Sequence, residues 1–87
     1  MADIIFTEVG WEQYIEWQFE DKKTLKKINR LLKSIDRDGP LSGEGKPEKL
    51  RYDSKSYSRR IDEANRLVYE VSEGQIKVKA CKGHYDD

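Results

Sequence analysis

Hydrophobic and polar residues alternate along two stretches near the C-terminal end of the chain, residues 66–71 and 75–82. Successive side chains of a β-strand point to opposite faces, so this alternation predicts two strands with one buried face and one wetter face. Turn-forming residues at 62–65 and 72–74 favour tight antiparallel connections, and a third strand is expected to begin near Ser58. The side chains predicted to share the buried face are Leu67, Tyr69, Val71, Ile76, Val78 and Ala80.

A helical spacing governs the first part of the chain. Residues 3–7 form a short apolar run that predicts a strand, and Thr7 is a candidate N-cap for a helix that continues to about Glu20. Asp21 then predicts a break and a new N-cap, followed by a second helix to about Ile35. The predicted core-facing stripes are Trp11, Tyr14, Ile15 and Gln18 in the first helix, flanked by Trp17, and Leu25, Ile28, Leu31, Leu32 and Ile35 in the second.

These elements predict a single α+β domain over residues 1–87. An N-terminal strand and a two-helix hairpin would pack on an antiparallel sheet and cover its apolar face. The chain has 87 residues, of which 36% are hydrophobic, and two Trp and five Tyr supply large side chains for the core. A core of this size predicts moderate stability, so a bound partner could stabilise the domain further.

Charge is balanced overall but unevenly distributed. The 17 basic and 17 acidic residues cancel, which argues weakly against nucleic-acid binding. The first 21 residues nevertheless carry six acids and no base, whereas residues 22–37 carry seven bases and one acid. This asymmetry favours a surface with a basic side. For residues 22–33 taken alone, we prefer the alternative interpretation that the basic residues form an ordinary solvated helix face.

Cysteine content and hydropathy bear on the compartment. Cys81 is the one cysteine, which excludes an internal disulfide and a zinc cage of cysteines, and fits a reducing environment. No apolar run is long enough to span a bilayer, and no signal peptide is evident. We therefore expect a cytoplasmic protein with no membrane partner.

The residues available for chemistry are one histidine, several glutamates and many basic side chains. Metal-free RNA cleavage needs a base for the 2′-hydroxyl proton, an acid for the leaving 5′ oxygen, and cations for the charge on the phosphoryl oxygens. Composition alone leaves His84 as either a catalytic or a structural histidine. The loop at residues 38–47, with three Gly and two Pro, is either a plain surface connection or a segment that presents Glu48 to the open face of the sheet.

Several short motifs run in order along nearly the whole chain. They are Trp11-x-x-Tyr14-x-x-Trp17, Lys26-Lys27-Ile28-Asn29, Gly45-Lys46-Pro47-Glu48, Ser58-Arg59-Arg60-Ile61, Asn65-Arg66-Leu67-Val68-Tyr69, Ala80-Cys81 and His84-Tyr85. Together, at this spacing, they resemble the YoeB toxin family within the RelE-like superfamily.

The resemblance implies a role for each matching residue. Glu48 would be the general base, Arg66 a clamp on the phosphate and the transition state, and His84 the general acid, with Tyr85 orienting the mRNA or the acid. The residues themselves support no metal site and no dinucleotide site, so no cofactor is expected. The residues implied to bind RNA phosphates are Lys46, Arg51, Arg59 and Arg60, with Arg60 preferred over Arg59.

The resemblance also implies a function. Members of this family are toxins of toxin–antitoxin pairs and cleave mRNA in the ribosomal A site, so the expected partners are the 70S ribosome, mRNA and a YefM-like antitoxin, with a homodimer left open. The alternative is a RelE-fold binding module that has lost catalysis and acts only as an antitoxin partner or corepressor. Retention of Glu48, Arg66 and His84 together favours the ribosome-dependent endoribonuclease.

Overall fold

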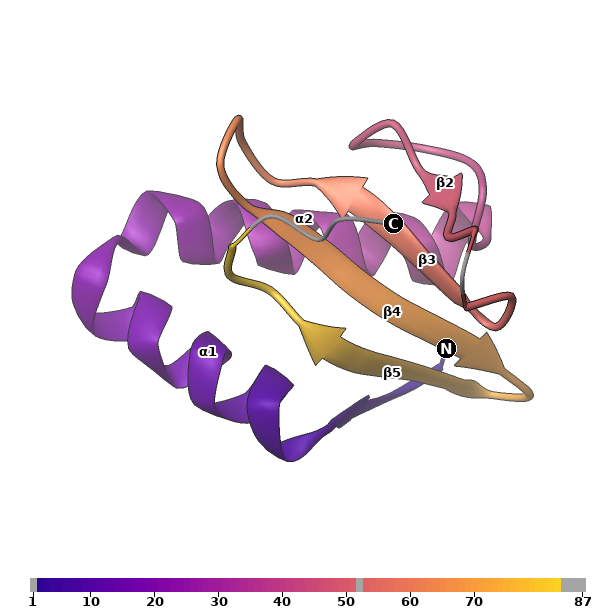
Figure 1. Ribbon diagram of the computed structural model, residues 1–87, viewed down its shortest axis with the longest axis horizontal. Coiled ribbons are helices and arrows are strands. Elements are labelled where there is room, and N and C mark those ends of the chain that lie inside the picture. The colour runs from indigo at the N-terminus through magenta and orange to yellow at the C-terminus, as the bar shows by residue number, and fades with distance from the viewer. Residues whose placement is uncertain (1, 52, 84–87) are drawn as a thin grey trace.

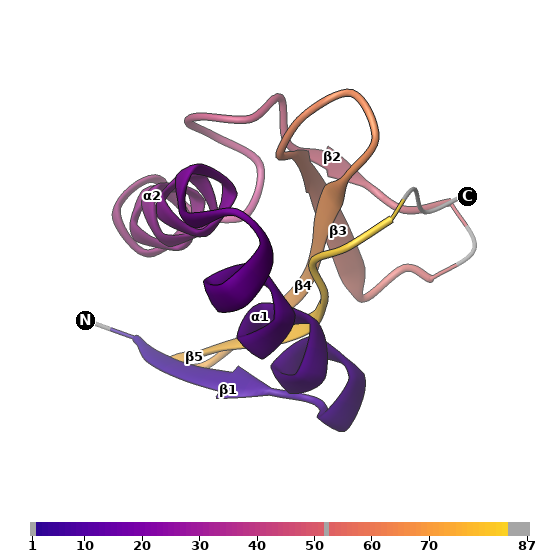
Figure 2. The ribbon, with the colours of Figure 1, turned by 90° about the vertical axis from the view of Figure 1, so that its left-hand side faces the viewer.

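The computed structural model describes residues 2–51 and 53–83 and shows two helices packed on one face of a five-stranded sheet (Figures 1 and 2). This architecture confirms the predicted α+β class. The elements in chain order are β1 (Asp3–Phe6), α1 (Glu8–Glu20), α2 (Lys22–Asp38), β2 (Glu48–Lys49), β3 (Ser56–Arg60), β4 (Arg66–Ser72) and β5 (Gln75–Ala80).

The sheet is mixed, with the strand order β1-β5-β4-β3-β2. The pairs β2–β3, β3–β4 and β4–β5 are antiparallel, as predicted for the C-terminal strands. β1 instead pairs parallel with β5, from Asp3 opposite Gln75 to Phe6 opposite Val78. Alternation indicates which face of a strand is buried but not the direction of its neighbour, so the parallel edge could not be predicted from it.

One aspartate both ends the first helix and begins the second. The backbone N–H of Asp21 donates to the Trp17 carbonyl at 3.0 Å, which closes α1. Its carboxylate accepts from the N–H of Lys23 at 3.0 Å and of Thr24 at 3.4 Å, which opens α2. A hydrogen bond from the Thr24 hydroxyl is the main cause that lowers the pKa of Asp21. The Thr7 cap of α1 is likewise confirmed, since its hydroxyl accepts from the Gly10 N–H at 3.1 Å.

The stripe predicted for α2 is confirmed. The stripe predicted for α1 is wrong at Trp11 and Gln18, whereas Tyr14 packs against the core as predicted. Trp17 is the buried tryptophan of α1, whereas Trp11 is 49% exposed and Gln18 lies on the surface. The indole Nε1 of Trp17 donates to the Cys81 carbonyl at 2.8 Å, which points this ring toward the end of β5. Helical spacing alone allows either tryptophan to face inward, and this buried hydrogen bond selects Trp17.

The core lies between the helices and the sheet. Its sheet side includes the Leu67–Tyr69 alternation of β4 and the Ile76–Val78 alternation of β5, as predicted. Arg66 and Glu70 therefore fall on the other face of β4, which we call the open face. The cluster of buried residues comprises Trp17, Ile28, Leu31, Leu32, Ile35, Ile61, Leu67, Tyr69, Ile76, Val78 and Cys81.

Gly10 lets α1 approach β5 closely, a constraint that no local pattern of residues indicates. A Cβ at Gly10 would collide with the Val78 carbonyl oxygen and lie 3.1 Å from the Val78 carbonyl carbon. Both atoms belong to the backbone of a central core strand, so neither can move aside cheaply. The glycine thus sets the distance between the first helix and the sheet.

Replacing Gly10 with alanine is expected to destabilise the domain. Alanine favours a helix by about 1 kcal/mol over glycine, but overpacking against the strand backbone costs about 1–3 kcal/mol. Urea unfolding should therefore show Gly10→Ala to be less stable than wild type, while Glu12→Ala, on the exposed side of the same helix, should lie within about 0.5 kcal/mol of it. A Gly10→Ala protein more stable than wild type would contradict the close approach.

Candidate active site

Arg66 is anchored by neighbouring strands on the open face. Its guanidinium donates to the Ser58 hydroxyl from Nε at 3.2 Å and from Nη2 at 3.0 Å, and Nη2 also donates to Glu48 Oε1 at 3.2 Å. The register brings these groups together, because Glu48 of β2 lies opposite Ser58 of β3. We call Glu48, Ser58 and Arg66 the Arg66 cluster.

The two charged members of the Arg66 cluster differ in exposure. The side chain of Arg66 is 17% exposed and that of Glu48 is 64% exposed. An arginine that is held by a hydroxyl and keeps part of its surface open can bind an anion without first losing much side-chain entropy. The exposed carboxylate can accept a proton from a bound molecule. The arrangement thus combines a fixed cation with an accessible base.

Arg60 lies directly across the sheet from Arg66. The two residues are paired in the β3–β4 register, so their side chains leave the same face. Like charges in this position repel one another, and among the residues that the structure describes no ion pair neutralises Arg60. A phosphate group between them would relieve the repulsion and gain two charge-assisted contacts.

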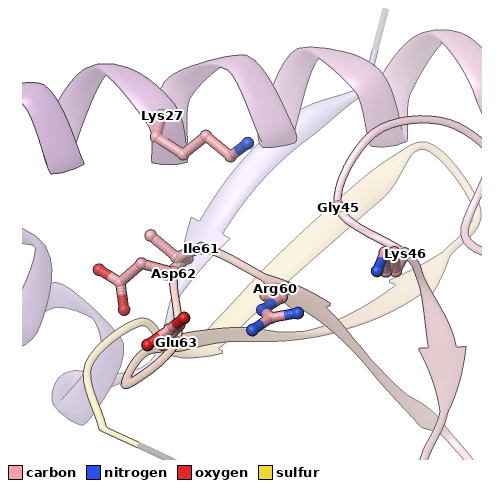
Figure 3. Close-up of a pocket in the computed structure, with 7 residues that line it drawn as sticks. All are labelled: Lys27, Gly45, Lys46, Arg60, Ile61, Asp62 and Glu63. Atoms are coloured by element: carbon pink, nitrogen blue, oxygen red, sulfur yellow. The ribbon is translucent and has the colours of Figure 1, made fainter.

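Arg60 also lines a surface pocket of about 410 Å³. Figure 3 shows Lys46 at one end of this pocket, the carboxylates of Asp62 and Glu63 at the other, Arg60 between them and Lys27 extending from α2. Two of the predicted RNA-binding residues, Lys46 and Arg60, therefore line one pocket. Lys27 was not among the predicted site residues.

Arg59 is not a surface residue, so its predicted contact with RNA phosphate is wrong. It is fully buried, at 0% exposure, and lies opposite Leu67 on the core side of the sheet. Its Nε donates to the Tyr69 hydroxyl at 2.8 Å, and its other N–H groups point to Ser34 and to loop carbonyls. Neighbouring residues of a strand face opposite sides, so the Arg59–Arg60 pair could not place both guanidinium groups on the open face.

The loop at residues 39–47 is tied to α2 by Glu44. The Glu44 carboxylate accepts from Arg30 Nη2 at 2.6 Å and from Lys27 Nζ at 2.9 Å. Hydrogen bonds from Arg30 and then Lys27 lower the pKa of the Glu44 carboxyl to about 2. The loop is therefore not the plain surface connection that its composition allowed, and it leads directly into Glu48.

The remaining predicted site residues are placed only in part. Arg51 is exposed, just beyond β2, while His84 and Tyr85 lie outside the described residues. The described chain reaches Gly83, whose carbonyl accepts from the Arg66 N–H at 3.0 Å. The C-terminal end of the described chain is thus beside the Arg66 cluster.

Ser58 is a residue of the candidate site that the motifs alone do not single out. Its hydroxyl accepts two of the hydrogen bonds that orient Arg66. The alternation along β3 carried the signal, because it places Ser58 and Arg60 on one face and Arg59 on the other.

Other kinds of site find no support in the described ranges. Across residues 2–51 and 53–83 there is no group of three or more His, Cys, Asp or Glu side chains that could hold a metal ion. Burial raises the pKa of the Cys81 thiol to about 12, which removes it as a thiolate nucleophile at neutral pH. No helix within the described part of the chain is long and apolar enough to cross a membrane.

Comparison with known proteins gives consistent similarities. Residues 6–85 match the model of a family described as the YoeB-like toxin of bacterial type II toxin–antitoxin systems. Toxin YoeB of Streptomyces coelicolor is 47% identical over 83 residues, covering 94% of this chain and 98% of that protein.

Two solved structures from Staphylococcus aureus show the same fold. The toxin in a heterotetrameric YoeB–YefM toxin–antitoxin complex is 51% identical with a TM-score of 0.90, covering 98% of this chain and 99% of that one. A chain of the YoeB dimer is 52% identical with a TM-score of 0.92, covering 97% and 98%.

Because the Glu44 carboxylate is paired with Lys27 and Arg30, we expect the folded protein to lose stability in acid as this carboxylate is protonated. Its pKa is lower in the folded protein than the ordinary value of 4.5, so ionised Glu44 favours the folded state. Wild type should therefore have a larger free energy of unfolding than Glu44→Gln. This difference should be fully present above about pH 4.5 and should disappear as the pH falls toward about 2. Urea unfolding of both proteins between pH 2 and 7 measures this difference. A difference that is constant across the range would show that the charged pairs do not stabilise the loop.

Proposed function

Because the chain belongs to the YoeB-like toxin family of bacterial type II toxin–antitoxin systems, we propose that it is an endoribonuclease that cleaves mRNA in the ribosomal A site. The observation that carries the proposal is the Arg66 cluster, with Arg60 across the sheet. It supplies an accessible carboxylate and two cations on one face, which suits acid–base cleavage of a phosphodiester.

The proposed reaction needs no group from outside the chain and its RNA substrate. Glu48 takes the proton of the 2′-hydroxyl, and the 2′ oxygen forms a bond to the adjacent phosphorus. Arg66 and Arg60 stabilise the negative charge on the phosphoryl oxygens. The bond to the 5′ oxygen breaks, and His84 gives that oxygen its proton. The products are a 2′,3′-cyclic phosphate and a 5′-hydroxyl.

Two features support the proposed role of His84. It is the residue after Gly83, whose carbonyl accepts from the Arg66 N–H at 3.0 Å. The ordinary pKa of histidine near neutrality suits a group that donates a proton at physiological pH. Tyr85, the next residue, would orient the mRNA or the acid.

The proposed dependence on the ribosome follows from how little acid–base power the site contains. The proposed base is a carboxylate, a weak base at neutral pH, so most of the rate must come from holding the 2′-hydroxyl in line with the scissile bond. A ribosome already holds the codon in its A site. Lys22, Lys23 and Lys26 are exposed at the start of α2 and could contact ribosomal RNA, whereas Lys27 is paired with Glu44.

The partners are proposed from the relatives. YoeB of S. aureus is found with YefM in a heterotetramer and also as a dimer. We infer a YefM-like antitoxin for this chain, with an acidic segment that covers Arg60 and Arg66, and self-association as a homodimer. Lys46 and Arg51 would contact mRNA beside the reacting phosphate, and the protein would act in the cytoplasm.

The second candidate is a catalytically inactive binding module that serves only as an antitoxin partner or corepressor. Such a module would have no need for an exposed carboxylate next to an anchored arginine. The Glu48–Arg66 contact at 3.2 Å therefore favours the enzyme.

The purified protein should cleave mRNA on a ribosome with an open A site quickly, and the same mRNA free in solution slowly or not at all. Glu48→Gln, Arg66→Ala and His84→Ala should each lower the ribosome-dependent rate by about 10²–10⁴-fold, because each removes a base, a clamp or an acid. Single-turnover cleavage of end-labelled mRNA measures these rates.

Glu12→Gln is the matched control, since it makes the same chemical change on the exposed side of α1 and should cleave at the wild-type rate. Thermal unfolding of every variant separates loss of catalysis from loss of fold. Equal rates on free and ribosome-bound mRNA would contradict ribosome dependence. A folded wild-type protein that binds ribosomes without cleaving mRNA would favour the inactive binding module.

A further inference from the structure

Arg59 uses every donor of its guanidinium inside the protein. An arginine side chain carries five N–H donors, and the structure gives this one five hydrogen bonds. Besides Tyr69, it donates from Nη1 to the Ser34 hydroxyl at 3.0 Å. The other three acceptors are carbonyls of the loop, those of Glu44 and Gly39 at 2.7 Å and of Ser42 at 2.6 Å.

The buried charge is compensated without a direct ion pair in the described chain. The Gly39 carbonyl belongs to the C-cap of α2, where the helix dipole places partial negative charge. Ser34, one turn earlier, accepts from Arg59 and donates to Asp38 Oδ2 at 3.1 Å, so a carboxylate is linked to the guanidinium through one hydroxyl. Arg59 therefore joins β3 to the end of α2.

The loop packs closely around the Arg59 guanidinium. Gly43 has φ +100°, and a Cβ there would collide with the Ser34 hydroxyl and lie 2.6 Å from Asp38 Oδ2 and 3.2 Å from Arg59 Nη1. Gly45 has φ +94°, and a Cβ there would lie 2.8 Å from a Leu31 methyl group. Both glycines are needed for their backbone conformation and for the absence of a side chain.

The end of the same loop carries two proposed site residues. The Gly45 carbonyl accepts from the Arg60 N–H at 2.7 Å, so β3 holds the loop through the Arg59 side chain and through its own backbone. Lys46 follows with φ 50°, an uncommon value for a residue other than glycine, and lines the pocket of Figure 3. Glu48 comes two residues later, in a strand of only two residues. Pairing over so short a strand is weak by itself, so Glu48 depends on the loop that precedes it.

We propose that Arg59 is a positioning residue for the reaction, because its guanidinium fixes residues 39–45 and thereby sets where Lys46 and Glu48 stand relative to Arg66. The inference rests on the proposed endoribonuclease function and deepens it. Arg59 touches no substrate. It acts through the loop, and its loss displaces the base rather than removing it.

The test combines two substitutions that loosen the loop by different means. Arg59→Lys keeps the charge but offers at most three donors in place of five. Gly43→Ala keeps Arg59 and pushes the loop away from it. Gly74→Ala is the control, because it also places alanine at a positive φ, +68°, in the distant β4–β5 turn, where nothing lies within 4 Å of the new Cβ.

Two measurements are made on each protein. The first is hydrogen exchange of residues 39–49 compared with residues 24–35 of α2. The second is single-turnover cleavage of mRNA on programmed ribosomes over a range of ribosome concentrations. We expect both loop variants to exchange faster in 39–49 but not in 24–35. Their maximal rate should fall by roughly 10²-fold with a nearly unchanged half-saturating concentration, since a small displacement of a reacting group costs about this much.

The outcomes separate this inference from the proposed function. If wild type cleaves and Gly43→Ala matches Gly74→Ala in rate and exchange, Arg59 is only a core residue and the inference fails while the function stands. A higher half-saturating ribosome concentration with an unchanged maximal rate would also overturn the inference, because the loop would then serve binding alone. If wild type does not cleave ribosome-bound mRNA, the function fails and the positioning role fails with it. Should Arg59→Lys not fold, Gly43→Ala decides the question alone.

Discussion

The hydrogen bonds of the buried Arg59 guanidinium are the interaction on which the geometry of the candidate active site depends. Removing a charged group from water costs several kcal/mol, and the structure offsets this with five hydrogen bonds and the negative end of α2. Those acceptors come from a helix end, a glycine-containing loop and a tyrosine of β4. One side chain thus joins the helical layer, the loop and the sheet, and the loop it fixes leads to Glu48.

Strand β3 contributes residues to both faces of the sheet. Along β3, Arg59 points to the core, while Ser58 and Arg60 point to the open face. Ser58 then orients Arg66, and the register sets Arg60 across from it. The alternation along β3 therefore gives Arg59 a structural role in the core and leaves Arg60 on the open face, where it is available for the proposed phosphate contact. This division explains how a chain with no net charge can still present a local concentration of cations.

Much of the fold could be predicted from local signals, because they act within a few residues. The Thr7 and Asp21 caps, the stripe of α2 and the alternation of β4 each depend on spacing alone. The face of α1 and the parallel pairing of β1 could not, since they depend on contacts with β5 more than 60 residues away along the chain. Within the site, Glu48, Arg60 and Arg66 were predicted from motifs and the structure brings them together. Alternation along β3 could have predicted that Arg59 faces the core. Its five hydrogen-bond acceptors could not be predicted, because they come together only when the loop, α2 and β4 are folded around it.

Attack by the 2′-hydroxyl of the mRNA is the step on which the proposed function depends, and one substituted substrate tests it. An mRNA that carries a single 2′-deoxynucleotide on the 5′ side of the cleaved bond is placed in the A site of a ribosome and compared with the all-ribose mRNA. The deoxy substitution should abolish cleavage at that bond, while the ribose mRNA should yield a 2′,3′-cyclic phosphate. Cleavage of the deoxy mRNA at the same bond and rate would rule out attack by the 2′-hydroxyl, because the proposed nucleophile would be absent.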